Sequence, residues 1–171
     1  SNVVILGGTG PVGVASAVIC AKAGANVTLV GRSLEKAEKI AGICNDRYDS
    51  KNIKGGADAD KSDFFNAADI VLNTGAAGIQ LMSEEHIKNS NTLKICADTN
   101  AVPPSGIAGV DVMDNGKVID MSPSKCLGIG ALAIGNIKYK SQHECLKLMY
   151  SSEKPVYLDF EDAFKFAQKS V

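Results

Sequence analysis

The sequence has no excess of charge of either sign. Eighteen lysine and arginine residues stand against nineteen aspartate and glutamate residues, which gives a formal net charge of −1. A general nucleic-acid surface needs clustered excess basic charge. We therefore expect no nucleic-acid partner for this protein.

Long apolar runs and paired cysteine motifs are also lacking. No run reaches the roughly 20 residues of a membrane span, and no signal peptide is visible. The five cysteines are odd in number, scattered, and without the C-x-x-C spacing typical of zinc or redox sites. We expect no membrane association, no metal site and no disulfide framework. A reducing cytoplasm is the simplest setting.

The most informative stretch is a strand, a glycine turn and a helix in direct succession. Val3–Leu6 is a short apolar run, Gly8–Gly13 reads G-x-G-x-x-G, and Pro11–Ala23 has helical length. In this motif the first glycine permits a tight turn, the second lets the backbone approach a pyrophosphate, and the third lets the helix pack closely on its strand. The helix start also favours a bound anion. The motif predicts dinucleotide contacts from Gly8, Thr9, Gly10, Pro11 and Val12.

Strand and helix patterns alternate along the rest of the chain. Strands are expected at 25–30, 53–57, 69–74, 93–97 and 118–121, and helices at 33–44, 60–67, 81–89, 128–150 and 160–169. On the first helix, Val12, Ala15, Val18 and Ile19 are expected to face inward. Buried strands alternating with helices predict a Rossmann-type, doubly wound parallel sheet in three α/β/α layers. Its ligand is expected beyond the carboxyl ends of the strands.

The end of the second strand lacks the acid that binds a ribose 2′-hydroxyl in NAD sites. The chain reads Val30-Gly31-Arg32-Ser33 there, and Lys36 lies one turn further along. A guanidinium can pair with a 2′-phosphate through two parallel hydrogen bonds. We therefore predict NADP as the cofactor, held by Gly31, Arg32, Ser33 and Lys36. The alternative is that Arg32 and Lys36 are solvated charges at a helix start.

Small residues follow the next buried strand, at Thr74, Gly75, Ala76 and Ala77. Such a turn would admit the cofactor's ribose or nicotinamide near backbone amides, although it could equally be an ordinary tight turn. Asp98 ends the neighbouring strand at the same edge and could equally be a helix or turn cap. His86 and His143 are expected to be surface imidazoles.

Across nearly its whole length the chain resembles the cofactor-binding part of NADP-dependent methylene-tetrahydromethanopterin dehydrogenases. The resemblance rests on five segments, at 8–13, 30–32, 74–78, 97–107 and 128–132, of which the last two are the most specific. It implies a hydride transfer from the methylene group of a pterin or folate to NADP⁺. It also implies that Asn100 and Ile129 lie at the cofactor site, and that Lys138 and Lys140 are candidate active-site residues.

The same resemblance implies a further domain upstream of Ser1, which would form the other wall of the substrate cleft. Residues 1–171 would then be the NADP-binding domain. The apolar stripe on helix 128–150 would face that further domain, a second subunit or simply its own sheet. Two alternatives remain: a shikimate dehydrogenase-like enzyme, and an NADP-binding module without catalysis.

Overall fold

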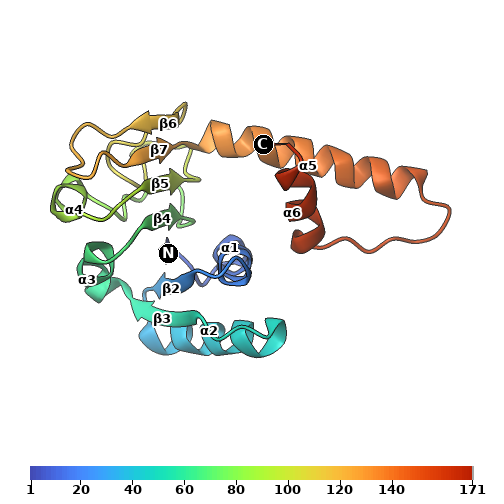
Figure 1. Cartoon of the computed structure of the whole chain (residues 1–171), viewed down its shortest axis with the longest axis horizontal. Helices are drawn as coiled ribbons and strands as arrows, with labels where there is room; N and C mark the ends of the chain where they lie inside the picture. The colour runs from blue at the N-terminus through green and yellow to red at the C-terminus, as the bar shows by residue number, and fades with distance from the viewer. Residues whose placement is uncertain (171) are drawn as a thin grey trace.

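The computed structural model describes residues 1–170, which form a seven-stranded sheet with helices on both faces (Figure 1). The strand order is β3-β2-β1-β4-β5-β7-β6, and every neighbouring pair is parallel except β7 and β6. The strands are β1 (Asn2–Leu6), β2 (Asn26–Gly31), β3 (Ile53–Ala57), β4 (Ile70–Asn73), β5 (Ile95–Asp98), β6 (Asn115–Val118) and β7 (Leu127–Ile129). The predicted Rossmann-type fold is confirmed, with an antiparallel edge strand that was not expected.

Helices α1 (Pro11–Lys22) and α2 (Leu34–Tyr48) cover one face of the sheet, and α3 (Lys61–Asn66) and α4 (Glu84–Asn89) cover the other. Alternate residues of β1 show how the core divides. Val3 and Ile5 pack with α1 and α2, whereas Val4 and Leu6 pack with α3 and α4. Because both faces are covered, strands in this half of the sheet read as continuous apolar runs.

The inward face of α1 differs from the prediction. Its buried residues are Gly13, Ala17, Val18 and Ala21, whereas Val12 is 58% exposed. The helix is apolar on nearly every side, so periodicity could not identify the inner face. Small residues at a spacing of four decide it, because they let the helix axis approach the sheet closely.

Two further elements lie elsewhere than expected. The strand expected at 118–121 lies earlier, as β6, which ends at Val118. Strand β7 overlaps the start of the helix that was expected at 128–150. That helix, α5 (Ala131–Ser151), begins directly after β7 and projects away from the sheet, and α6 (Phe160–Gln168) packs back against it (Figure 1). Asp159 caps α6 by accepting hydrogen bonds from the N–H groups of Glu161 and Asp162.

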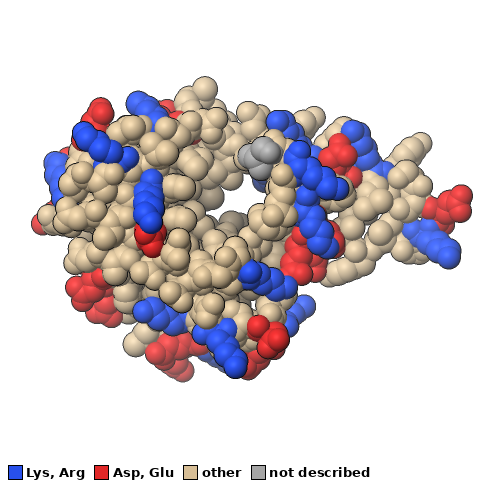
Figure 2. Space-filling view, viewed as in Figure 1, with Lys and Arg blue, Asp and Glu red and all other residues tan. Residues whose placement is uncertain are grey.

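No helix among residues 1–170 is both long enough and apolar enough to cross a membrane. Positive and negative side chains are interspersed over the visible surface, which also shows an opening beside the α5–α6 arm (Figure 2). This even distribution agrees with the balanced composition.

His86 is a structural part of α4 and not an unpartnered surface imidazole. Its Nδ1 accepts a hydrogen bond from the backbone N–H of Ser83 at 3.0 Å, and the Ser83 hydroxyl accepts from the N–H of His86. The other ring nitrogen lies 3.2 Å from the Ser62 hydroxyl, and the ring edge meets Phe65. These contacts form a capping box that also ties α4 to α3.

We predict that folding stability falls as the pH drops through the titration range of His86. Burial, followed by the positive charge of Lys61, lowers the pKa of His86 against the opposing effects of Glu85 and Asp58. The folded state therefore disfavours the charged imidazole, and Nδ1 can accept the Ser83 bond only when it is unprotonated. The stabilisation is complete above the unfolded-state pKa of about 6.5 and is lost below it.

Urea unfolding at pH 7.5 and 5.5 measures this effect. His86→Gln is expected to lose part of the pH dependence, since glutamine keeps the capping box without titrating. The exposed His143 provides the matched control, His143→Gln. Equal pH dependence in the wild type and His86→Gln would contradict the prediction.

Candidate functional site

The carboxyl ends of β1, β2, β4, β5 and β7 meet along one edge of the sheet. The chain winds from β1 outward through β2 to β3 on one side, and from β4 outward through β5 on the other. The connections therefore change direction between β1 and β4. In open α/β sheets this position leaves a crevice in which ligands bind.

Three glycines of the turn after β1 are needed for packing. Gly7 adopts a positive φ of 65°, and a Cβ there would lie 2.5 Å from the Cα of Gly75. A Cβ on Gly13 would lie 2.5 Å from the Cα of Gly8. The third motif glycine thus packs as expected, but the left-handed turn residue is Gly7 and not Gly8. Gly7 is the first residue after β1, which ends at Leu6.

Gly10 differs from its neighbours because no residue of 1–170 crowds it. A Cβ on Gly10 would have its nearest neighbour at 3.6 Å, in the carbonyl oxygen of Gly7. Its backbone, at φ −86° and ψ 169°, suits any residue. Within residues 1–170 no side chain caps α1 at this point, and Pro11 has no N–H to satisfy. The space beside Gly10 and the helix start therefore fits an anionic ligand such as a pyrophosphate.

The loop after β2 lies against the same turn. A Cβ on Gly31 would lie 2.8 Å from the methyl group of Thr9. Arg32 and Lys36 are exposed and form no ion pair with any residue of 1–170. The Ser33 hydroxyl caps α2 by accepting a hydrogen bond from the N–H of Lys36 at 3.3 Å. Its own O–H remains able to donate, so these residues fit a phosphate beside the glycine turn.

The loop after β4 is fixed to β1 at its start. The N–H and the hydroxyl of Thr74 both donate to the carbonyl of Leu6, each at 2.9 Å. The N–H of Gly75 donates to the side-chain oxygen of Asn73 at 3.1 Å. Ala76 and Ala77 follow and are exposed at the edge of the sheet. This arrangement places small, exposed residues at the same edge of the sheet as the glycine turn.

A buried carboxylate organises the loop after β5. Asp98 is 1% exposed and accepts four hydrogen bonds, from the side chain of Asn73 at 2.7 Å and from three backbone N–H groups. Those N–H groups belong to Asn100 at 2.9 Å, Gly106 at 2.7 Å and Ile107 at 3.1 Å. Asp98 is therefore a turn cap, which was one of the roles expected for it from the sequence.

Asn100 joins two loops of the site. Its side-chain oxygen accepts from the N–H groups of Gly78 at 3.3 Å and Val102 at 2.9 Å, and its amide donates to the carbonyl of Pro104 at 2.8 Å. With these bonds its polar atoms are already engaged in holding the loops after β4 and β5 together. A direct contact of Asn100 with the cofactor stays a prediction.

Asn73 and Gly106 are structural members of the site that sequence reasoning missed. Asn73 is fully buried and pairs in register with Asp98 on the neighbouring parallel strand. Gly106 stands so close to Asn73 that a Cβ would collide with the side-chain amide. The available signal was a polar residue ending each of two adjacent buried strands, which predicts that the two side chains meet.

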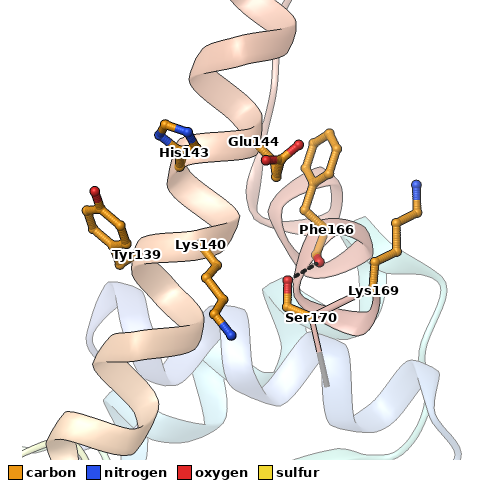
Figure 3. A pocket seen from close by; sticks show the side chains of 7 residues that line it. All are labelled: Tyr139, Lys140, His143, Glu144, Phe166, Lys169 and Ser170. Atoms are coloured by element: carbon orange, nitrogen blue, oxygen red, sulfur yellow. Dashed lines mark hydrogen bonds between the residues drawn. The ribbon is translucent and has the colours of Figure 1, made fainter.

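Lys138 and Lys140 do not converge on one cavity. Lys138 lines a groove of about 880 Å³ between α5 and α6, together with Ile134 and Met149. Lys140 lies in a separate hollow of about 360 Å³, on the side of α5 that faces the end of α6 (Figure 3). Residues two apart on a helix point in nearly opposite directions. A single ligand is therefore not expected to contact both lysines.

Ile129 ends β7, beside Ala97 of β5, and is half-buried. It occupies the same edge as the glycine turn, and its contact with the cofactor stays a prediction. Among residues 1–170 there is no group of three or more histidine, cysteine, aspartate or glutamate side chains placed to hold a metal ion.

Two curated relatives match most of this chain. The chain is 38% identical over 169 residues to the NAD(P)-dependent methylenetetrahydromethanopterin dehydrogenase of Methylorubrum extorquens, covering 97% of this chain and 56% of that protein. It is 36% identical over 149 residues to the bifunctional protein MdtA of the same organism, covering 85% of this chain and 50% of that protein. The chain thus spans about half the length of these relatives. No family model matches the sequence.

Solved structures of low sequence identity share the fold. Quinate dehydrogenase from Corynebacterium glutamicum, solved in complex with NAD, superposes with a TM-score of 0.61 at 16% identity, covering 100% of this chain and 55% of that one. Shikimate dehydrogenase of Mycobacterium tuberculosis gives a TM-score of 0.55 at 16% identity, covering 96% and 56%. These matches support the architecture alone. The sequence relationship goes further: this chain is a homologue of NAD(P)-dependent methylenetetrahydromethanopterin dehydrogenase, matched over about half of that protein's length.

Proposed function

We propose that residues 1–171 are the NADP-binding domain of an oxidoreductase of one-carbon metabolism. Its reaction is the transfer of a hydride from the methylene group of methylene-tetrahydromethanopterin or methylene-tetrahydrofolate to NADP⁺. The observation that carries the proposal is the 38% identity to a methylenetetrahydromethanopterin dehydrogenase over 97% of this chain. The open Gly10 and the unpaired Arg32 agree with it, because they fit a pyrophosphate and a 2′-phosphate.

The chain's own residues would bind and orient the cofactor. Gly10 and the first turn of α1 would hold the pyrophosphate, and Arg32, Ser33 and Lys36 would hold the 2′-phosphate. The loop of Thr74–Ala77, fixed through Asn73 and Asn100, would support the nicotinamide half. In this placement, the loops after β1 and β2 would hold the adenosine half of the dinucleotide, and the loop after β4 would hold the nicotinamide half.

Bound NADP⁺ supplies an electrophilic C4 that accepts the hydride. The methylene carbon gives up a C–H bond with both electrons and becomes a methenyl cation shared by the two adjacent nitrogens. No proton has to move in this step, so the protein needs no acid–base pair for it. Proximity and orientation are then the main contributions of the site.

The reaction is tested by following methenyl-pterin absorbance with methylene-tetrahydromethanopterin or methylene-tetrahydrofolate and NADP⁺. The 171-residue chain is assayed alone and together with the part of the Methylorubrum relative that it does not match. Turnover in either assay supports the proposal, and turnover by the chain alone excludes a binding-only module. NADPH formation with shikimate and not with either pterin would overturn it.

Arg32 should determine the preference for NADP over NAD. We predict that Arg32→Gln weakens NADPH binding roughly 10- to 100-fold, since a hydrogen bond to a charged group contributes about 1.5–3 kcal/mol. NADH lacks the 2′-phosphate, so its affinity should change less than about twofold. Fluorescence titration of each nucleotide measures both affinities. Arg47→Gln, which removes an equal charge at the far end of α2, is the control. Equal losses for NADPH and NADH would contradict the assignment.

A further inference from the structure

A small pocket lies beyond the carboxyl end of β5, and Asn100 is the one member of the candidate cofactor site that lines it. The loop 100–105 forms one wall and the segment 110–112 forms the other, around a volume of about 260 Å³. Sites for drug-sized ligands typically have volumes of about 300–1,000 Å³. The pocket therefore fits one ring system and not a whole dinucleotide.

This pocket adjoins the place proposed for the nicotinamide. Asn100 lines it and also accepts a hydrogen bond from the N–H of Gly78, in the loop after β4, at 3.3 Å. In the other wall, the carbonyl oxygens of Asp111 and Val112 would collide with a Cβ added to Gly130. Gly130 directly follows β7, so segments that leave β4, β5 and β7 meet at the pocket. A ligand in it would lie beside the nicotinamide half of a bound dinucleotide.

Both walls of the pocket are held in place by buried carboxylates. Asp98 accepts hydrogen bonds from backbone N–H groups at both ends of the loop after β5. Asp114 is 6% exposed, and its carboxylate accepts a hydrogen bond from the N–H of Asp111 at 2.7 Å. The carbonyl of Asp114 accepts from the N–H of Gly130 at 2.8 Å. Binding to such a preformed pocket loses little free energy, because few groups have to be ordered.

The lining of the pocket is mostly apolar, with a single charged residue. Alanine, proline and valine side chains make up most of it. The side chain of Asn100 is already engaged, and the Ser105 hydroxyl donates to the carbonyl of Ile107 at 3.0 Å. The charged residue is Asp111. Its Oδ1 accepts from the N–H of Met113 at 2.9 Å, and its Oδ2 accepts no hydrogen bond from any residue of 1–170. This carboxylate can therefore accept hydrogen bonds from a ligand.

Apolar walls and one available carboxylate suit a flat ring that presents N–H donors along one edge. The pteridine ring common to the proposed substrates has such an edge, formed by its N3–H and its 2-amino group. A carboxylate can accept two parallel hydrogen bonds from donors arranged in this way. The nicotinamide carboxamide presents a single amino group beside an oxygen, which a carboxylate would repel. The pocket therefore matches the pteridine ring better.

We propose that Asp111 binds the N3–H and 2-amino edge of the substrate's pteridine ring. The inference rests on the proposed function, because the pterin substrate comes from it. A ring in this pocket would lie beside the nicotinamide, and direct hydride transfer needs the two rings to be held close together. Asp111 is then a specificity-determining residue and does not itself take part in the transfer of the hydride.

The test compares two ring analogues, titrated without oxygen into the chain with NADP⁺ bound. One is 6-methyltetrahydropterin, which has the 2-amino group, and the other is 6-methyltetrahydrolumazine, which has an oxygen in its place. The wild type should prefer the pterin. Asp111→Asn should weaken pterin binding roughly 10- to 100-fold, since hydrogen bonds to a charged group are lost. It should also bind the lumazine better than the wild type does, because its amide can donate to the 2-oxygen.

Two features make this comparison specific. Asparagine keeps the oxygen that accepts from Met113, so the turn at Asp111 is preserved. Asp120→Asn, which neutralises another exposed carboxylate, is the control and should leave both affinities unchanged. The inference is overturned if the wild type binds neither ring or if Asp111→Asn keeps the wild-type preference. Weaker NADPH binding by Asp111→Asn would also overturn it, by assigning the pocket to the nicotinamide.

Turnover separates this inference from the proposed function. In the methenyl-pterin assay described above, Asp111→Asn should raise the KM for the pterin substrate at least about tenfold and leave the KM for NADP⁺ unchanged. Turnover with an unchanged pterin KM would refute the role of Asp111 and leave the proposed function intact. A wild-type chain that binds the pterin ring without turnover in either assay would support the pocket and count against the proposed reaction.

Discussion

Asp98→Asn is expected to destabilise the fold by roughly 3–5 kcal/mol, because each hydrogen bond to a charged group contributes about 1.5–3 kcal/mol and such contributions are not additive. The carboxylate is 1% exposed and accepts four hydrogen bonds. An asparagine amide would turn an N–H toward one pair of these donors and leave them unpaired. Urea unfolding at pH 7 measures the loss.

The control is Asp120→Asn, which neutralises an exposed carboxylate on the turn after β6. Its effect should stay within about 0.5 kcal/mol. A loss of less than about 1 kcal/mol for Asp98→Asn would show that the carboxylate does not organise the loop after β5.

At a low temperature at which the variant remains folded, Asp98→Asn should affect ligand binding by one half of the cofactor site and not by the other. The carboxylate fixes the loops after β4 and β5, but it has no contact with Arg32 on the loop after β2. We expect weaker NADPH binding and unchanged binding of adenosine 2′,5′-bisphosphate, which lacks the nicotinamide half. A purely global loss of structure would weaken both ligands together, so this comparison distinguishes positioning from unfolding.

Gly13→Ala and Gly10→Ala are expected to have opposite consequences. A Cβ at Gly13 would lie 2.5 Å from the Cα of Gly8, and backbone on both sides leaves no flexible atom to yield. We expect a loss of several kcal/mol, as for severe overpacking. A Cβ at Gly10 meets nothing closer than 3.6 Å, and its φ of −86° suits alanine. The folded protein should therefore tolerate Gly10→Ala with a change below about 1 kcal/mol.

The same Gly10→Ala change should nevertheless reduce NADPH affinity at least about tenfold, because the methyl group would occupy the space into which a pyrophosphate fits. Thermal unfolding and fluorescence titration of both variants provide the measurements. Gly24→Ala offers no suitable control, since Gly24 has a positive φ of 86°. Gly135→Ala does, because its added Cβ has no neighbour within 4 Å. Normal NADPH binding by Gly10→Ala would remove the main structural argument for the site.

The fold class was predictable from the sequence alone, and the candidate site was expected at one edge of the sheet. Alternation of buried strands with helices has one common solution, a parallel sheet with helices on both faces, and the carboxyl ends of its strands must then share an edge. The glycine turn and the residues around Arg32 could be placed at that edge without coordinates, because each directly follows a strand. Helix caps such as Ser33 and Asp159 were also predictable, since they are local.

The residues that hold this edge together could not be predicted from the sequence, because they meet only through tertiary contacts. Asp98, Asn73 and Gly106 are far apart in sequence, and their hydrogen bonds depend on the register of two parallel strands. Strand β7 could not be predicted from the sequence, because a strand of three residues, one of them glycine, is too short to show the alternation of apolar and polar residues typical of strands. The inner face of α1 could not be predicted for a related reason. Apolar residues occur on several sides of this helix, so contacts with neighbouring elements, and not spacing, determine which side is buried.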